Sequence, residues 1–370
     1  MSESITKIIS FISFILIGVL LKRKFSNREE LNGLKKIILL LALPATIFIS
    51  LLKINLQANL ILLPFLALGL NMLLFVITPT LLIFLDIKDK PQVNTAKLLL
   101  PSLAPGLSCF PFIFEFLGDS YLAKAAMADL GNKFFVLFIL YIVAIKWYYR
   151  NHSDRQEPLK EKIKSLGKVM LFEPINILIV IALIFLIFGI SFYDLPIFLQ
   201  DNLNRLAAML TPMVLLFIGL AIKVKRKSFI QIFSLLMLRY GVTLLLVGCI
   251  VSLVQFTVSD DVLFMLVFSL SACSFWPFAH ISSITSKEID LKDGQKTFDI
   301  DYALSLLALS LPLSVLLILA VFISEKTFTT PKNIFLLAFC IIAAGIIVPF
   351  YKWAKNGAQI KSKFSRIEKY

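Results

Sequence analysis

The chain has few of the residues that build enzyme active sites and metal centres. Of its 370 residues, 2 are His and 4 are Cys, and no two Cys have the CxxC spacing of zinc or redox sites. The GxxxxGK[ST] loop that binds ATP phosphates is absent, as are the HExxH and GxSxG motifs of hydrolases. These absences argue against an enzyme and an ATP-driven pump, and they give no reason to expect a cofactor or a metal.

Charged residues are also scarce, and most of them are basic. The chain has 23 Asp and Glu against 37 Lys and Arg, with only 16% of its residues charged and 59% hydrophobic. It contains 34 Phe, and its mean hydropathy is +0.89. A soluble domain of this length cannot hide so much apolar surface. The composition therefore predicts an all-α polytopic membrane protein that lies in a lipid bilayer.

Hydrophobic runs of about 20 residues, the length that a bilayer requires, recur along the chain. Basic residues gather in the loops after the odd-numbered runs, and basic loops stay cytoplasmic. This asymmetry predicts an outward N-terminus, an inward C-terminus and, in a bacterium, an inner-membrane location. Because the charge of +14 is spread over every inner loop, no nucleic-acid partner is expected. The runs predict eleven spans, at about residues 5–22, 33–52, 58–85, 97–118, 120–145, 173–191, 203–222, 228–256, 261–286, 298–323 and 331–350.

Two of these spans contain nearly the same five residues, Ser108-Cys109-Phe110-Pro111-Phe112 and Ser274-Phe275-Trp276-Pro277-Phe278. A proline within a span removes a backbone donor and breaks the helix. A matched pair of broken spans is typical of the central site of a secondary transporter, where the breaks meet at the bilayer midplane. The two motifs therefore predict helix breaks in the fourth and ninth spans.

The two halves of the chain repeat each other at offsets of about 166 to 172 residues. Leu31-Asn32-Gly33-Leu34 precedes Pro44 as Leu203-Asn204-Arg205-Leu206 precedes Pro212. Each half holds an odd number of spans, so the second repeat is inverted. We expect a first five-helix repeat at residues 1–149, a cytoplasmic linker at 150–172, an inverted second repeat at 173–323, and an extra span with a basic cytoplasmic tail at 324–370.

Polar residues at the predicted breaks and inside the neighbouring spans are the candidates for function. A broken helix exposes unsatisfied N–H and C=O groups that attract charged ligands. Charges inside a membrane need a partner or a role, which makes Asp129, Asp301 and Arg239 candidate ion-coupling residues. The candidate substrate-binding residues are Ser108, Cys109, Pro111, Asn132, Ser274, Pro277 and His280.

Each candidate also has a purely structural interpretation. Asp129 and Lys133 are one helical turn apart and can neutralise each other. Asp301 lies either beside the second break or at the membrane surface, and Arg239 pairs with an acidic residue or with an anionic substrate. His280 either relays protons or packs through a hydrogen bond. Serines in membrane helices often bond their own backbone.

Short sequence patterns are spread over most of the chain: GVLLKRK from Gly18, LALPATIF around Pro44, PINI from Pro174, LTPMVLLFIGLA around Pro212, and Pro277-Phe278-Ala279. Together, over about residues 5–323, they resemble the auxin efflux carrier family of permeases, within the superfamily of bile-acid, arsenite and riboflavin transporters. The resemblance implies a ten-helix inverted repeat with crossed, broken fourth and ninth helices, a homodimer, and elevator-like movement of organic anions. Ser108 and Cys109 depart from the Asn-rich crossing of the auxin-transporting plant members, and the eleventh span is additional.

The expected function is secondary active transport of small organic anions, such as dicarboxylates or weak aromatic acids, coupled to a proton gradient, a Na⁺ gradient or the membrane potential. Two alternatives stay open. One is a sodium-coupled symporter of the bile-acid or bicarbonate type. The other is a sensor that has a transporter fold without turnover.

Overall fold

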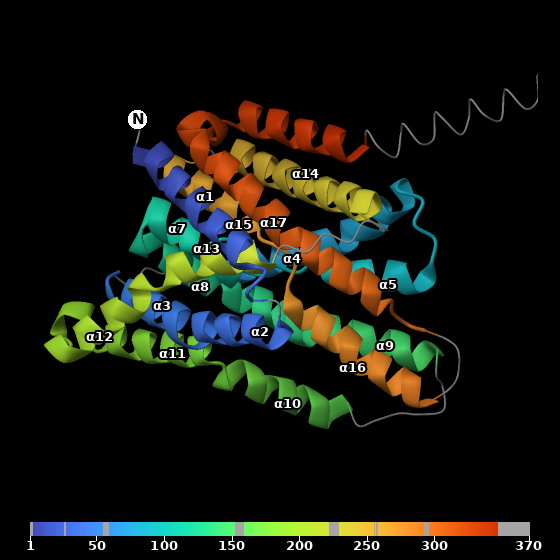
Figure 1. Cartoon of the computed structure of the whole chain (residues 1–370), viewed down its shortest axis with the longest axis horizontal. Coiled ribbons are helices and arrows are strands. Elements are labelled where there is room, and N and C mark those ends of the chain that lie inside the picture. Colours follow the sequence, from blue (N-terminus) through green and yellow to red (C-terminus); the bar gives the residue numbers. More distant parts are fainter. Residues whose placement is uncertain are drawn as a thin grey trace, which may run out of the picture.

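The chain folds into a bundle of helices in its computed structural model (Figure 1). The structure describes residues 3–25, 27–54, 59–151, 159–221, 229–254, 256, 258–291 and 296–346, and among them it contains no β-strand. Six helices in this part of the chain are long and apolar enough to cross a membrane, and one bent helix pair would make a seventh. They are Glu29–Leu52, Leu60–Phe84, Asp119–Asn151, Ile197–Ala221, Phe229–Val254 and Ile300–Ile323, with the pair Ile163–Phe172 and Pro174–Ile187. The prediction of an all-α polytopic membrane protein is confirmed.

Several of the eleven predicted spans are helices that are too short, or too interrupted, to cross a membrane as one continuous helix. The apolar part of α1, Ile9–Leu21, and the last described helix, Pro331–Ile346, are short. The fourth predicted span is divided into α5, α6 and α7, and the ninth into α15 and α16. The number of crossings therefore stays a prediction. The basic tail at 351–370 lies outside the described residues.

Polar caps and prolines set the starts of several helices. Asn27, Asp89 and Asp299 accept hydrogen bonds from backbone N–H groups in the first turns of α2, α5 and α17. A π-helical turn at Ile38–Ala42 runs directly into the helix that carries Pro44, which is where a proline ring needs extra room. The helices are α1 (Glu3–Leu21), α2 (Arg28–Ile37), α3 (Leu43–Leu52), α4 (Asn59–Phe84), α5 (Lys90–Leu99), α6 (Pro105–Ser108), α7 (Phe110–Leu117), α8 (Asp119–Phe134), α9 (Leu140–Asn151), α10 (Leu159–Phe172), α11 (Pro174–Ile187), α12 (Ile197–Ala208), α13 (Leu210–Ala221), α14 (Phe229–Val254), α15 (Ser259–Ser269), α16 (Phe275–Leu291) and α17 (Ile300–Ile323).

Helices of the two halves recur at one separation. The last residues of α5 and α15, Leu99 and Ser269, are 170 positions apart, and each helix ends just before an irregular segment. This agreement fits a repeat of about 170 residues, while its inversion and the domain boundaries given above stay predictions.

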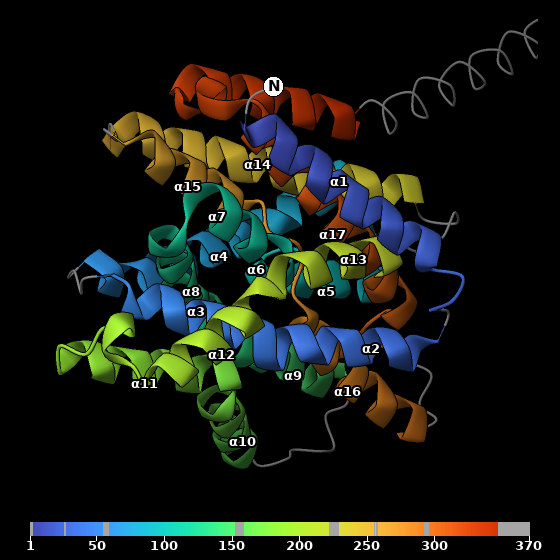
Figure 2. The same cartoon turned by 60° about the vertical axis from the view of Figure 1, so that its left-hand side comes forward.

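Helix packing divides the bundle into two groups. In the first, the scaffold group (α1–α3 and α11–α13), α1 packs along α13, and α3 packs on α11 and α12. In the second, the core group (α4–α9 and α14–α17), α4 packs on α8 and on α14, while α16 packs on α9 and α17. Figures 1 and 2 both show α3, α11 and α12 side by side in the lower part of the molecule. The two groups meet where α3 packs on α8, where α1 packs on α17, and where α13 packs on α7 and α17.

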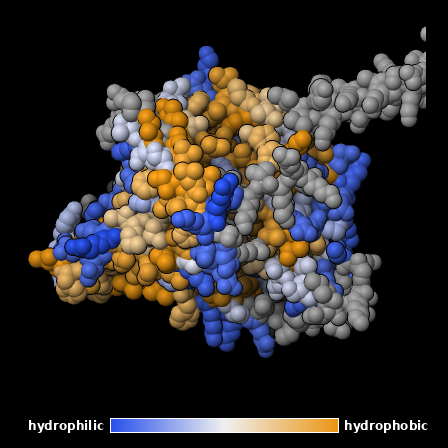
Figure 3. Space-filling view, in the orientation of Figure 1, coloured by the Kyte–Doolittle hydropathy of each residue, from blue (hydrophilic) through white to orange (hydrophobic). Residues whose placement is uncertain are grey.

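Polar contacts gather at the two ends of the bundle. At one end, Lys90 donates to Asn151 at 3.1 Å, and Asn151 donates to Thr297 at 3.0 Å. At the other end Lys53 pairs with Asp119 at 3.0 Å. The view in Figure 3 has hydrophobic surface over much of its upper and middle part, and hydrophilic residues at its left and right margins and from its centre to its lower edge. Residues at three of the predicted inner loops thus lie together, although which end faces the cytoplasm stays a prediction.

The additional helix Pro331–Ile346 packs along α14 in the core group (Figure 2). Gly241 of α14 lies against Ile342 and the backbone of Ala338, so the two backbones approach closely. Close approach at small residues is the usual way in which helices associate in membranes. The eleventh predicted span therefore covers one face of α14.

Gly131 of α8 should tolerate no side chain, because a Cβ there would overlap the carbonyl oxygen of Pro64 in α4. We expect Gly131→Ala to lower stability by about 1–3 kcal/mol, the usual cost of overpacking. The matched control is Gly69→Ala in α4, since a Cβ at Gly69 has no neighbouring atom within 4 Å. Thermal unfolding in detergent measures both variants, and equal unfolding temperatures would contradict the close contact of α4 with α8.

Candidate functional site

Two helices are interrupted about halfway across the bundle. After the ten residues of α5 the chain is irregular at 100–104, and after the eleven residues of α15 it is irregular at 270–274. Each of these half-helices is about 15 Å long at 1.5 Å per residue. That is half the thickness of a bilayer core of about 30 Å. Residues 100–104 and 270–274 together are called the crossing below.

The two prolines of the repeated motif lie just after the breaks. Pro111 is the second residue of α7, and Pro277 is the third residue of α16. The main interruptions therefore lie several residues before the prolines, which corrects the positions expected from the motif. The physical reason is that N–H groups in a first turn have no helical acceptor, so proline is tolerated there. A smaller discontinuity does fall inside the first motif, at Cys109, where φ is −128°.

The two interrupted segments satisfy one another's backbone groups. The N–H of Ala104 donates to the carbonyl of Ala272 at 2.8 Å, and the N–H of Ala272 donates to Ser108 Oγ at 3.1 Å. The N–H of Ser274 donates to Ser102 Oγ at 2.9 Å. Unpaired backbone groups cost several kcal/mol each inside a membrane, so these bonds make the breaks tolerable.

An amide from α8 holds the first break. Asn132 is buried, accepts a hydrogen bond from the N–H of Leu103 at 3.1 Å and donates to its carbonyl at 2.9 Å. The same side chain donates to Asp129 at 2.8 Å and accepts from Asn71 of α4 at 2.8 Å. The carbonyl oxygen of Asn71 is buried and has no donor among the described residues. Three polar side chains from two helices thus converge beside the first break.

Hydroxyl groups from α17 hold the second break. Ser310 accepts a hydrogen bond from the N–H of Cys273 at 3.3 Å, and Ser314 donates to the carbonyl of Leu270 at 2.6 Å. The hydroxyl of Tyr240 donates to the carbonyl of Ser310 at 3.0 Å. The two breaks are therefore supported by different chemistry, an amide on one side and hydroxyls on the other.

Arg239 of α14 joins both breaks. Its Nε donates to the carbonyl of Leu100 at 2.6 Å, and its two terminal nitrogens donate to the carbonyls of Ser102 and Ser271 at 3.0 Å each. The side chain is buried. These carbonyls lie within the first three residues after α5 and α15, on the side where helix dipoles place negative partial charge. The guanidinium thus bonds backbone carbonyls, and the role of Arg239 in ion coupling or substrate binding stays a prediction.

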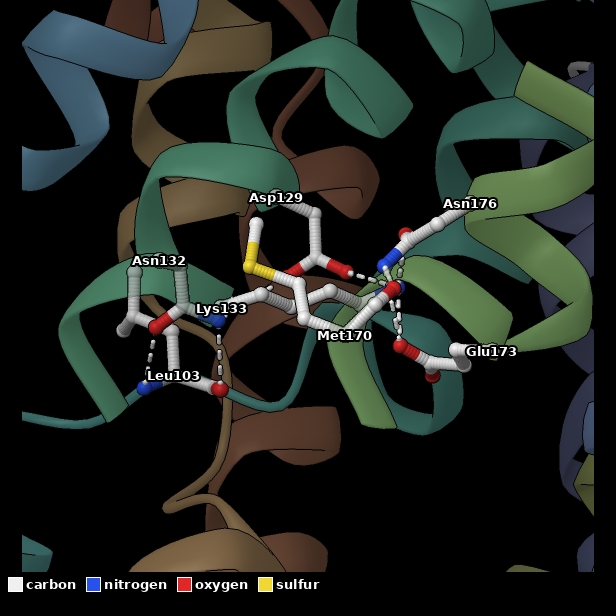
Figure 4. Close-up of polar contacts among 7 residues, drawn as sticks. All are labelled: Leu103, Asp129, Asn132, Lys133, Met170, Glu173 and Asn176. Carbon is white, nitrogen blue, oxygen red and sulfur yellow. Dashed lines mark hydrogen bonds and ion pairs between the residues drawn. The ribbon is translucent and has the colours of Figure 1, made fainter. Parts of the chain in front are cut away.

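A buried charge cluster lies between the core group and the scaffold group (Figure 4). Lys133 of α8 is 3.6 Å from Asp129, 3.1 Å from Glu173 and 2.9 Å from the amide oxygen of Asn176. Asn176 also donates to the carbonyl of Met170 at 2.6 Å, at the bend between α10 and α11. The ion pair of Asp129 with Lys133 is present, and it extends to Glu173, just before α11, and to Asn176 within α11.

The structure brings most of the candidate residues to the crossing but not all of them. Ser108, Cys109, Asn132, Ser274 and Arg239 lie at or beside it, and Asp129 is one hydrogen bond away through Asn132. The hydroxyls of Ser108 and Ser274 bond nearby backbone groups, at the carbonyl of Ala104 and the N–H of Trp276. Their roles in binding stay predictions.

Two candidates lie farther away. His280 is buried and its Nε2 is 2.9 Å from the carbonyl of Val136, with its ring against the edge of Tyr141. Asp301 is exposed in the first turn of α17, nine residues before Ser310 and thus about 13 Å from it along the helix axis. The structure therefore places Asp301 at the end of the bundle and not at the crossing.

Sequence reasoning missed several polar residues of this region, among them Glu173. Ser310 and Ser314 carry no charge, and serines in spans have no distinctive signature. Asn71 and Asn176 did have a signal, since each is an amide within an otherwise apolar stretch. No group of three or more His, Cys, Asp or Glu side chains is placed to hold a metal within the described residues.

The amide of Asn132 should be necessary for the first break. Asn132→Ala leaves the N–H and C=O of Leu103 without these bonds, and each unsatisfied buried group costs about 1–3 kcal/mol. We expect a lower unfolding temperature than for Asn204→Ala, a matched change at an exposed position of α12. If both variants unfold like the unmodified protein, Asn132 does not support the break.

Comparison with known proteins gives a distant relative. No family description matches the chain. A protein described as an uncharacterized transporter, from Methanocaldococcus jannaschii, is 26% identical over 208 residues, which cover 55% of this chain and 63% of that protein. The match thus spans less than two thirds of the relative's length. With the apolar helices, this similarity supports a multi-pass membrane transporter.

Proposed function

We propose that this protein is a secondary active transporter of small organic anions, such as dicarboxylates or weak aromatic acids, and that the crossing holds the substrate. The observation that carries the proposal is the meeting of two interrupted helices, whose first halves are each about as long as half a bilayer core. Interrupted helices at this depth are found where backbone groups line a transport site. The similarity to an uncharacterized transporter supports the same class of function.

The charges around the crossing favour an anion. Arg239 binds carbonyls just after α5 and α15, whereas α16 begins directly after the second break and α7 begins at Phe110, after the short helix α6. Helix N-termini carry positive partial charge and exposed N–H groups, which suit a carboxylate. The free atom of Asn71 is an acceptor oxygen, so it adds nothing to this preference. A carboxylate at the crossing would thus meet positive charge from Arg239 and from the helix starts.

We further propose that the core group moves against the scaffold group during transport, in the manner of an elevator. Lys133 is the residue that such a movement affects most, because its two carboxylate partners belong to different groups. Asp129 lies on the same helix as Lys133, while Glu173 precedes α11 of the scaffold group. When the core group moves, Lys133 loses Glu173 and keeps Asp129, so its charge stays paired in both positions.

Reconstitution in liposomes tests the transport function. The purified protein is first screened against organic anions by thermal shift, because a ligand stabilises the state to which it binds. Binders are then followed as radiolabelled substrates in counterflow. We expect saturable exchange of at least one dicarboxylate or aromatic acid. Binding without counterflow would identify a sensor, and the absence of both would contradict the proposal.

Pro111→Ala and Pro277→Ala should both abolish this counterflow. Pro277 lies in the first turn of α16, next to the second break, and Pro111 lies in the first turn of α7, next to the discontinuity at Cys109. Each proline prevents its helix from extending farther back. The matched control is Pro196→Ala at the exposed start of α12, which should exchange substrate normally. Unchanged counterflow in both crossing variants, with the control also normal, would remove the breaks from the mechanism.

Glu173→Gln should change turnover without changing substrate affinity, because Glu173 contacts Lys133 and not the crossing. Loss of this pair removes an interaction present in only one position of the core group, so the maximal rate is expected to shift several-fold with KM unchanged. Glu161→Gln, at an exposed position of α10, is the control. A change in KM alone would argue against a role in movement.

A further inference from the structure

We propose that Arg239 is a built-in cation, which permanently fills the cation site formed by the carbonyl ends of the two broken helices. The inference rests on the proposed function, since it concerns what drives transport at the crossing. It assigns the protein to sodium-independent carriers and separates it from sodium-coupled symporters of similar plan.

The geometry around Arg239 is that of a cation site made of carbonyls. Three backbone oxygens, of Leu100, Ser102 and Ser271, surround the guanidinium at 2.6 to 3.0 Å. They come from both breaks, at the ends of helices whose dipoles point their negative ends inward. Unwound carbonyls and C-terminal half-helix ends are the groups that coordinate Na⁺ in secondary transporters. In this protein the guanidinium of Arg239 lies among the carbonyls, in the place of such an ion.

The guanidinium is also enclosed in a way that suits a permanent charge. Arg239 is buried, with 1% of its surface exposed, and its guanidinium lies 4.9 Å from the ring centre of Tyr240. No ion pair joins it to a carboxylate in the part of the chain that the structure describes. The planar guanidinium brings a positive charge to this site.

Two consequences follow for the crossing. A sodium ion would have to displace the guanidinium from its carbonyls, and it would bring a second positive charge next to the first. The positive partial charges at the starts of α7 and α16 are then not balanced by the guanidinium, and they favour an anion without a co-bound metal ion. Substrate binding and exchange should therefore proceed equally in sodium, potassium and choline salts.

Removing the guanidinium should turn this position into a site for a small cation. The variants are Arg239→Ala, which leaves the three carbonyls open, and Arg239→Gln, which keeps part of the hydrogen bonding and is the better folded alternative. The control is Arg205→Ala, which removes the same charge from an exposed position of α12. Unfolding temperature is measured for each protein while sodium chloride replaces choline chloride at constant ionic strength.

We expect the unmodified protein and Arg205→Ala to show no sodium-specific change. We expect both Arg239 variants to unfold at lower temperature in choline and to be stabilised by sodium in a saturable way. Guanidinium ion at low concentration should rescue Arg239→Ala and leave the control unaffected. Saturable sodium stabilisation of the unmodified protein would overturn the proposal, even if neither variant folds. A folded Arg239 variant with no response to sodium or guanidinium would also overturn it.

These measurements need no transported substrate, so they separate this inference from the proposed function. If no organic anion is exchanged but the salt responses are as expected, Arg239 is a built-in cation in a protein of another function. If organic anions are exchanged only with sodium, the transport function holds and the built-in cation is wrong.

Discussion

A backbone that leaves its helix inside a membrane must find other hydrogen-bond partners, and this constraint shapes the whole structure. The two interrupted segments of the crossing supply some of these partners to each other, as in the hydrogen bond from the N–H of Ala104 to the carbonyl of Ala272. The remaining groups are held by Asn132, Ser310 and Arg239, from three different helices. The crossing is thus the point at which α8, α14 and α17 are tied together, and the extra helix Pro331–Ile346 packs on one of them.

Some of the polar contacts hold the core group together, and others lie at its border with the scaffold group. Inside the core group, the contacts of Asn132 and Arg239 join elements that would travel together. At the border with the scaffold group, Lys133 has partners on both sides. A charge that stays paired before and after a displacement avoids the large cost of a buried unpaired ion. In the elevator scheme, the internal bonds therefore keep the site intact while the border allows motion.

The sequence predicted the class of fold and the neighbourhood of the site because those depend on composition and on proline. Apolar runs of membrane length and the pair Pro111 and Pro277 indicated membrane helices with two breaks. The breaks themselves lie upstream, since proline specifies a first turn and not the last residue before it. The partners of Arg239 were unpredictable for another reason: they are carbonyls, which every residue carries. The position of Asp301 depends on where α17 begins, which hydropathy places only approximately.

The central claim is that the two breaks form the binding site for an organic anion. The most direct measurement is a cryo-electron microscopy map of the protein in lipid nanodiscs with an anion that it exchanges. The account predicts non-helical density at residues 100–104 and 270–274, with ligand density between the starts of α7 and α16. Continuous helices through either segment, or ligand density away from the crossing, would contradict it.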